Sequence, residues 1–293
     1  MMKTEPAFCF CSLAFCQRYR DLALLLAKDI EKYSPNTYFI VLTDKISDFS
    51  QQPNVLAFKH RQQSIKFYHD KRFAIAKALS MFNSCIFLDA DMRILASVPA
   101  DMQWIKEPGI TARVFESMPK KYAKVIAGTA GAKLLWEFEV SKKAAQKINL
   151  ELSDENIKFV YEYLFAVTKD SGREIEFLKQ WEIIANYSEL NGLYDSEGNA
   201  IGLAAAKVGL PVRRSEMEGI SFFKDRVELV RIQKGQSNME EMSMYFQQQR
   251  MLEYPNRPIL EKIVVKLSKV IGYLYNSLRL RIVTLSNFGL YYR

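Results

Sequence analysis

The sequence has 293 residues, of which 49% are hydrophobic and 25% are charged. This balance is typical of a globular protein with a sizeable core, and it excludes a disordered or fibrous chain. The net charge of +8 is unevenly placed, because residues 255–293 contain seven basic residues and one acidic residue, and so hold six of the eight net positive charges. We therefore expect one main domain over residues 1–254 and a separate basic segment over residues 255–293.

Cysteine usage and hydropathy bear on the compartment. The cysteines at positions 9, 11, 16 and 85 do not have the spacing of a zinc site, and neither His60 nor His69 supplies a second pair of ligands. We expect reduced, structural thiols, which suit a reducing cytosol. The sequence shows no signal peptide and no run of about 18–20 apolar residues, so the chain is not expected to cross a membrane by itself.

In the first half, short apolar runs alternate with helical patterns. Apolar residues recur at helical spacing just after the first run and again over residues 67–82. Four runs have the length and composition of buried strands: residues 7–10, 38–42, 55–58 and 85–88. This order of strands and helices predicts an α/β protein with a mostly parallel central sheet flanked by helices.

The second half is less regular. Residues 110–115 and 125–129 are predicted strands, and residues 134–150 and 153–169 are predicted helices. An acidic turn that contains Asp195 and Glu197 then opens another helix, which Gly209 and Pro211 end.

Polar side chains follow three of the predicted strands in the first half. Ser12 and Asp44 follow the first two strands, and Asp89 and Asp91 follow the run 85–88 with only Ala90 between them. In parallel sheets, ligands bind beyond the carboxyl ends of the strands, so these groups are expected to share one crevice. Two carboxylates this close repel each other unless a cation lies between them or water solvates them. The pair is therefore either a divalent metal site or a solvated turn.

With this motif and its strand, the first half resembles the GT-A class of nucleotide-sugar glycosyltransferases, in which a D-x-D pair ends a buried strand. The similarity covers residues 7–212 and is most specific over residues 67–98, where HDKRFAIAKAL resembles the basic helix that precedes this strand. It implies a Rossmann-like fold with Mn²⁺ or Mg²⁺ on Asp89 and Asp91, bridging the donor diphosphate. By the same resemblance, Asp91 binds the metal directly, and Asp89 binds it through water or binds the ribose. Many retaining members also use a C-terminal His as a metal ligand, but no His follows His69 here.

Further donor and acceptor residues are candidates on chemical grounds. Lys71 and Arg72 are positive partners for the diphosphate, with solvated helix residues as the alternative. Ser12 and Asp44 are placed with them in the donor crevice. Glu197 and Asp195 are candidates for catalysis or acceptor binding, with helix capping as the alternative for Glu197. Trp181 and Tyr194 either stack on a sugar or belong to the core.

The basic segment predicts an amphipathic helix. Lys262, Lys266 and Lys269 share one face at helical spacing, and apolar residues occupy the other side. Such a helix suits an anionic membrane surface. The alternative is a helix that packs on the main domain with its lysines in water. Nucleic acid is not an expected partner, because no nucleic-acid-binding fold accompanies the charge.

Together these observations predict a metal-dependent glycosyltransferase. It would move a hexose from a nucleotide sugar, with a UDP-sugar as the expected donor, to a hydroxyl of a glycan or lipid-linked acceptor in surface polysaccharide or lipopolysaccharide synthesis. We expect it in the cytoplasm, peripherally attached to the inner face of the membrane. One alternative is a sugar-nucleotide nucleotidyltransferase, which usually has a Gly-rich loop that residues 10–20 lack. The other is a non-catalytic, membrane-docked sugar-binding protein.

Overall fold

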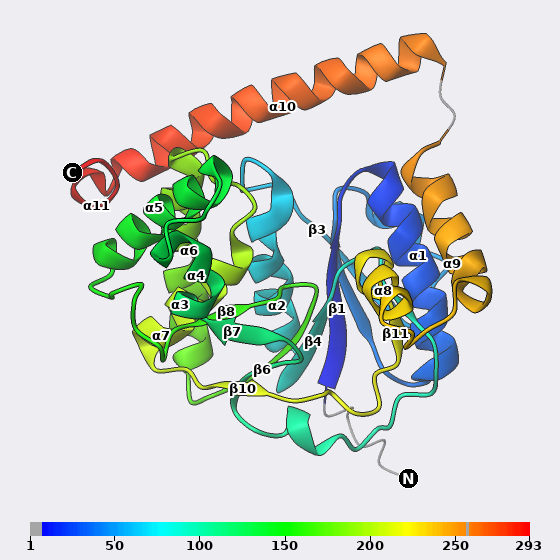
Figure 1. Ribbon diagram of the computed structural model, residues 1–293. Coiled ribbons are helices and arrows are strands. Elements are labelled where there is room, and N and C mark those ends of the chain that lie inside the picture. Colours follow the sequence, from blue (N-terminus) through cyan, green and yellow to red (C-terminus); the bar gives the residue numbers. More distant parts are fainter. Residues whose placement is uncertain (1–7, 256–257) are drawn as a thin grey trace.

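The computed structural model describes residues 8–255 and 258–293, and its centre is a seven-stranded sheet (Figure 1). The strand order is β10-β6-β9-β4-β1-β2-β3. Only β9 runs antiparallel to its neighbours, so the predicted mixed α/β fold with a mostly parallel sheet is confirmed. The strands are β1 (Phe8–Ala14), β2 (Phe39–Thr43), β3 (Val55–Lys59), β4 (Ser84–Leu88), β6 (Gly109–Ala112), β9 (Leu164–Thr168) and β10 (Val212–Arg214).

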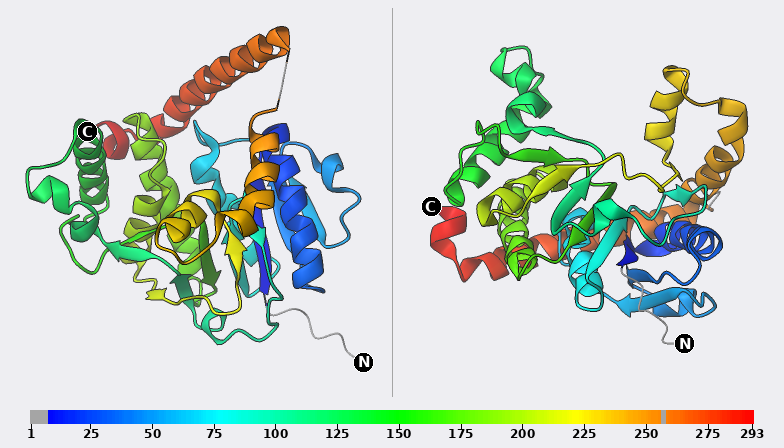
Figure 2. Two further views of the ribbon diagram at one scale, coloured as in Figure 1. Left: turned by 45° about the vertical axis from the view of Figure 1, so that its right-hand side comes forward. Right: turned by 90° about the horizontal axis from the view of Figure 1, so that it is seen from below.

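Helices cover both faces of the sheet (Figures 1 and 2). Alternate residues of β1 point to opposite faces, so that Phe8 and Phe10 pack towards α1 while Cys9 and Cys11 pack towards α2, α6 and α7. All four cysteines are free thiols. The helices that flank the sheet are α1 (Cys16–Tyr33), α2 (Lys71–Leu79), α6 (Arg173–Leu190) and α7 (Glu197–Val208), and α5 (Ala132–Lys147) packs against α6. Short 3₁₀ turns are η1 (Ile46–Phe49), η2 (Phe67–Asp70) and η3 (Gln103–Ile105).

Two predicted elements in the second half are wrong. The predicted strand over 125–129 is instead α4 (Ala123–Ile126), which follows α3 (Met118–Lys121). The predicted helix over 153–169 is instead β8 (Lys158–Val160), paired with β7 (Phe115–Ser117), followed by β9. The physical reason is that β9 lies inside the sheet between β4 and β6 and is buried on both faces, so its apolar residues do not alternate.

A second, two-stranded ribbon lies beside the main sheet. In it, β5 (Arg93–Ile94) pairs antiparallel with β11 (Phe222–Phe223). The chain continues into α8 (Asp225–Gln233) and α9 (Met239–Glu253), and α9 packs against α1 with an ion pair of 2.5 Å between Arg18 and Glu253. This ribbon thus brings residues from the end of the main domain back to the segment that follows β4.

The C-terminal segment forms α10 (Ile259–Leu285) and α11 (Phe288–Tyr292). In Figure 1, α10 lies across the top of the molecule. Only its C-terminal part packs on the domain, where Asn276, Leu280 and Thr284 are buried. Among the described residues, no helix has the length and apolarity needed to span a bilayer.

Candidate functional site

Four separate elements bring charged side chains to one place beside the carboxyl end of β4. Asp89 and Asp91 follow β4, Lys71 opens α2, Glu197 opens α7, and Lys224 follows β11. A turn shapes the aspartate segment, since the Met92 backbone N–H donates to the Asp89 carbonyl at 3.0 Å. We call these five residues the aspartate edge.

Two ammonium groups bridge the three carboxylates. Lys71 Nζ lies 3.0 Å from Asp89 Oδ1 and 3.2 Å from Glu197 Oε1. Lys224 Nζ lies 3.2 Å from Asp89 Oδ2 and also donates to Asp91 Oδ1. The Asp89 carboxylate is therefore held between two cations, and its close neighbour Asp91 is tolerated because Lys224 neutralises the repulsion.

Burial and these ion pairs shift the ionisation of the site. Burial alone would raise the pKa of Asp89, but Lys71 and Lys224 outweigh it and hold that pKa below its usual value. Burial raises the pKa of Asp91, and the Lys224 ammonium offsets part of this rise. Burial also raises the pKa of Glu197 to about 7, against the lowering effect of Lys71. Glu197 is thus a carboxyl group that can exchange a proton near neutral pH.

A buried histidine fixes the backbone on both sides of the site. His69 belongs to η2, just before Lys71, and its Nδ1 accepts a hydrogen bond of 3.2 Å from Trp181 Nε1. Its Nε2 lies 3.5 Å from the hydroxyl of Ser196, the residue before Glu197. Burial lowers the pKa of His69 to about 3, so the ring is neutral and its Nε2–H donates to Ser196. The starts of α2 and α7 are therefore tied together.

A divalent cation does not fit this arrangement as it stands. Such an ion would use the Asp89 and Asp91 carboxylates, but the Lys224 ammonium already contacts an oxygen of each. The described parts of the chain also contain no group of three His, Cys, Asp or Glu side chains that could hold a metal ion. Mg²⁺ and Mn²⁺ prefer several oxygen ligands, so binding one here requires that Lys224 leave.

Of the predicted site residues, the structure brings Asp89, Asp91, Lys71 and Glu197 together. Arg72, a predicted diphosphate ligand, makes its polar contacts elsewhere: it donates to the His69 carbonyl at 2.9 Å and lies 3.7 Å from Glu182 on α6. Because consecutive helix residues are about 100° apart around the helix axis, Lys71 and Arg72 reach different partners.

The remaining predicted side chains lie around this site without joining it. Asp195 is exposed and pairs with Lys133 at 3.4 Å. Asp44 pairs with Arg20 at 2.7 Å, and its Oδ2 accepts a hydrogen bond of 3.4 Å from the Cys16 backbone N–H. Ser12 is fully buried within β1.

The two aromatic candidates are placed by packing. Trp181 is fully buried and is part of the core. The Tyr194 hydroxyl lies 2.8 Å from the Tyr273 hydroxyl of α10, so this side chain links the main domain to the C-terminal helix.

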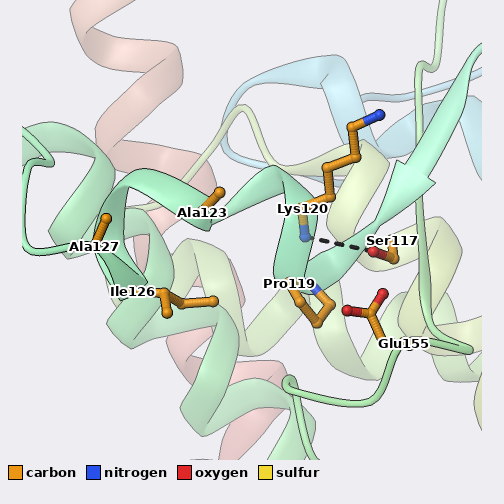
Figure 3. Close-up of a pocket in the computed structure, with 7 residues that line it drawn as sticks. All are labelled: Ser117, Pro119, Lys120, Ala123, Ile126, Ala127 and Glu155. Carbon is orange, nitrogen blue, oxygen red and sulfur yellow. Dashed lines mark hydrogen bonds between the residues drawn. The ribbon is translucent and has the colours of Figure 1, made fainter.

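Two surface hollows lie outside the aspartate edge. One hollow, of about 450 Å³, is lined by residues of α3 and α4 and by Glu155, and no residue of the aspartate edge lines it (Figure 3). The other, of about 370 Å³, borders β11 and is lined in part by Arg113, Phe222 and Arg231. Phe222, which lines the second hollow, precedes Lys224 by two residues.

Lys224 was not predicted as a site residue. Its partners Asp89 and Asp91 are 135 and 133 residues away along the chain, and no local pattern marks such a contact. The one local sign of this element is the two consecutive aromatic residues Phe222 and Phe223, because aromatic residues favour β-strands.

No protein-family model matches the sequence, and no curated protein matches it significantly. Among solved structures, the chain is similar to the apo structure of the bifunctional glycosyltransferase WbbM, with a TM-score of 0.45 and 12% sequence identity. The match covers 73% of this chain and 40% of that one, so it spans less than half of that protein's length. At this level the similarity concerns the course of the backbone alone.

Proposed function

We propose that this protein is a glycosyltransferase that moves a hexose from a nucleotide sugar, such as a UDP-sugar, to a hydroxyl group of a glycan or lipid-linked acceptor. The observation that carries the proposal is the aspartate edge: paired carboxylates, two ammonium groups with side chains 8% and 12% exposed, and a carboxyl group with a pKa of about 7, all beside the carboxyl end of a central strand. In open α/β sheets, this is where ligands bind.

The chemistry of transfer matches these groups. When the bond between the anomeric carbon and the diphosphate breaks, negative charge develops on the leaving oxygen, and fixed cations beside it stabilise that charge. Glu197 is buried and lies next to Lys71, and its pKa of about 7 suits a group that takes a proton from an acceptor hydroxyl. We assign Asp89 and Asp91 to orienting the cations at the diphosphate.

The metal ion expected from the sequence stays a prediction. Asp89 and Asp91 would be the residues that hold Mn²⁺ or Mg²⁺, and the ion would act as a Lewis acid on the diphosphate. Because Lys224 contacts both carboxylates, we assign no step of the reaction to the ion.

A thermal-shift screen of nucleotide sugars tests the proposed function. We expect one nucleotide and its sugar conjugate to raise Tm by about 5 °C at a concentration 100 times Kd, in EDTA or with Mn²⁺. The same ligand should then be consumed in an assay for donor hydrolysis. If no nucleotide raises Tm under either condition, the proposal is wrong. Binding without turnover, with or without a glycan acceptor, would favour the non-catalytic sugar-binding alternative.

We further propose that α10 docks the protein on an anionic membrane. The exposed apolar side chains of this helix are Ile259, Leu260, Ile263, Val264, Leu267, Val270, Ile271, Leu274, Leu278, Ile282, Val283 and Leu285. Lys262, Lys266 and Lys269 on the same helix complement an anionic lipid surface. An inner-face location follows from this proposal, because anionic lipids and nucleotide sugars are both available there.

The contacts of α10 support a lipid-linked acceptor. Side chains of this helix form hydrogen bonds with Arg61 and Gln63, which follow the carboxyl end of β3. Another hydrogen bond joins the helix to Tyr194, which lies just before α7. Both segments belong to the side of the sheet that carries the aspartate edge. A membrane beneath α10 would thus lie beside the proposed transfer site.

Vesicle co-sedimentation tests the membrane proposal. We expect binding to vesicles with anionic lipid and little binding to neutral vesicles. Changing Lys262, Lys266 and Lys269 to Gln should weaken binding about 100-fold, because each lysine near the surface contributes about 1 kcal/mol.

The matched control changes three exposed lysines on α5 and α7, Lys142, Lys143 and Lys207, to Gln. This triple variant removes the same net charge and should leave vesicle binding within about twofold, because these lysines lie outside α10. Equal losses in the two triple variants would mean that overall charge, and not α10, attracts the protein to the membrane.

A further inference from the structure

We propose that the ammonium group of Lys224 is the cation that binds the donor diphosphate, in place of a divalent metal ion. This inference rests on the proposed function and deepens it by naming the positive charge at the site. The D-x-D motif by itself leads to the opposite expectation, a metal ion between Asp89 and Asp91.

The fold anchors Lys224 at the aspartates. In the ribbon formed by β5 and β11, Phe223 is paired with Arg93, two residues after Asp91. The Phe223 side chain is fully buried and packs against the rings of Tyr245 and Phe246, with centroids 5.4 Å and 4.9 Å away. The backbone at Lys224 is therefore fixed by strand pairing and by packing on α9.

Two ammonium groups offset negative charge at the site without a metal ion. Lys224 contacts Asp89 and Asp91, Lys71 contacts Asp89 and Glu197, and the Lys224 side chain is only 12% exposed. The nearby aspartates keep the pKa of Lys224 above its usual value, although burial lowers it, so the group is charged. A divalent ion at the same carboxylates would lie against this ammonium and be repelled.

The two lysines differ in what they can still bind. An ammonium group has three N–H donors. Lys71 Nζ has three oxygen partners, namely Asp89, Glu197 and the Glu162 carbonyl at 3.5 Å. Lys224 Nζ has two acceptors within the described part of the chain, Asp89 and Asp91. Its third donor is available for a phosphate oxygen, a partner that lysine binds as a point charge.

With Lys224 bound to the diphosphate, each electron pair and the proton of the transfer have a defined destination. The bond between the anomeric carbon and the diphosphate oxygen breaks, and its electron pair stays on that oxygen beside the Lys224 ammonium. The acceptor oxygen forms the new bond to the anomeric carbon, and its proton passes to Glu197. The products are the glycosylated acceptor and a nucleoside diphosphate whose new charge is paired with Lys224.

Isothermal titration of UDP, GDP and ADP tests the inference, in EDTA and again with Mn²⁺. For the wild-type protein, we expect one diphosphate to bind in EDTA, with Mn²⁺ changing its Kd by less than about threefold. Lys224→Met should weaken binding in EDTA by about 10- to 100-fold, because a charge-assisted hydrogen bond is lost. Adding Mn²⁺ should restore binding to this variant, since Asp89 and Asp91 are then free to hold the ion.

Each other result has a distinct meaning. Wild-type protein that binds a diphosphate only with Mn²⁺, or Lys224→Met that binds as tightly as wild type in EDTA, overturns the inference and leaves the proposed function standing. If none of the three diphosphates binds under any condition, the proposed function fails, and this inference fails with it.

Two further variants and a second readout guard against misfolding. Lys224→Arg keeps the charge and should keep metal-free binding within about tenfold, while Lys234→Met removes a charge at the other end of α8 and should change nothing. Electron paramagnetic resonance of Mn²⁺ without nucleotide should detect bound ion with Lys224→Met but not with wild type. Bound Mn²⁺ in the wild-type protein would contradict the proposal, whatever the titrations show.

Discussion

The aspartate edge and α10 handle charge and apolar surface in opposite ways. The aspartate edge gathers five ionisable side chains that are between 4% and 23% exposed, whereas α10 exposes an apolar side to solvent. Burying ion pairs costs desolvation free energy, and large exposed apolar surface is uncommon on soluble domains. Neither arrangement is favourable for folding alone, so each is best explained by something that it binds. The following predictions test that contrast, from the largest expected effect to the smallest.

Removing one cation from the aspartate edge should have the largest effect. Lys71→Met removes the ammonium that Asp89 shares with the buried Glu197, which should lower the free energy of unfolding by about 3–5 kcal/mol. Urea titration followed by circular dichroism measures this loss. Lys77→Met on the same helix is the control and should cost less than about 1 kcal/mol. A similar small loss for Lys71→Met would show that the cluster is hydrated and not a buried network.

Neutralising Glu197 should impair transfer more than binding. Glu197→Gln keeps the shape of the side chain but cannot take a proton, so kcat should fall by about 10²- to 10³-fold, with Kd for the donor within about threefold. The measurement is kcat and donor Kd for one donor and acceptor pair. Equal changes in kcat and Kd would indicate that Glu197 binds the donor instead.

The pH dependence of stability should also report Glu197. Its pKa is raised to about 7 by burial, so between about pH 4.5 and pH 7 the folded protein holds a proton that the unfolded chain has lost. The stabilisation that comes from this bound proton is therefore lost as pH rises through that window. As pH rises from 5 to 8, the free energy of unfolding of the wild type should fall by about 1–3 kcal/mol more than that of Glu197→Gln. Parallel pH curves for the two proteins would rule out a titrating Glu197.

On α10, a buried and an exposed leucine should behave differently. Leu274 is 60% exposed, so Leu274→Ala should change the free energy of unfolding by less than about 0.5 kcal/mol. Leu280 is 4% exposed, and Leu280→Ala should cost several times more. Chemical denaturation of both variants decides this. A large loss at Leu274 would mean that this side of the helix packs on protein, and the docking proposal would lose its basis.

What could be predicted from the sequence depended on how local the signal was. Strand β4 and the pair Asp89 and Asp91 are adjacent in the chain, so the motif and its place at a strand end were visible. The interior strand β9 was missed because a strand buried on both faces lacks alternation, and its apolar run is also compatible with a buried helix. Lys224 was missed because its position depends on the pairing of β11 with β5, and the different partners of Lys71 and Arg72 depend on how α2 packs.

The position of α10 also affects how the two substrates reach the protein. The helix bonds to segments at the carboxyl-end side of the sheet, so a docked protein would receive its nucleotide sugar from three-dimensional solution and a lipid-anchored acceptor by lateral diffusion. Its turnover would then follow the number of acceptor molecules per unit area of bilayer. Diluting the vesicles at constant lipid composition would leave the rate per bound enzyme unchanged.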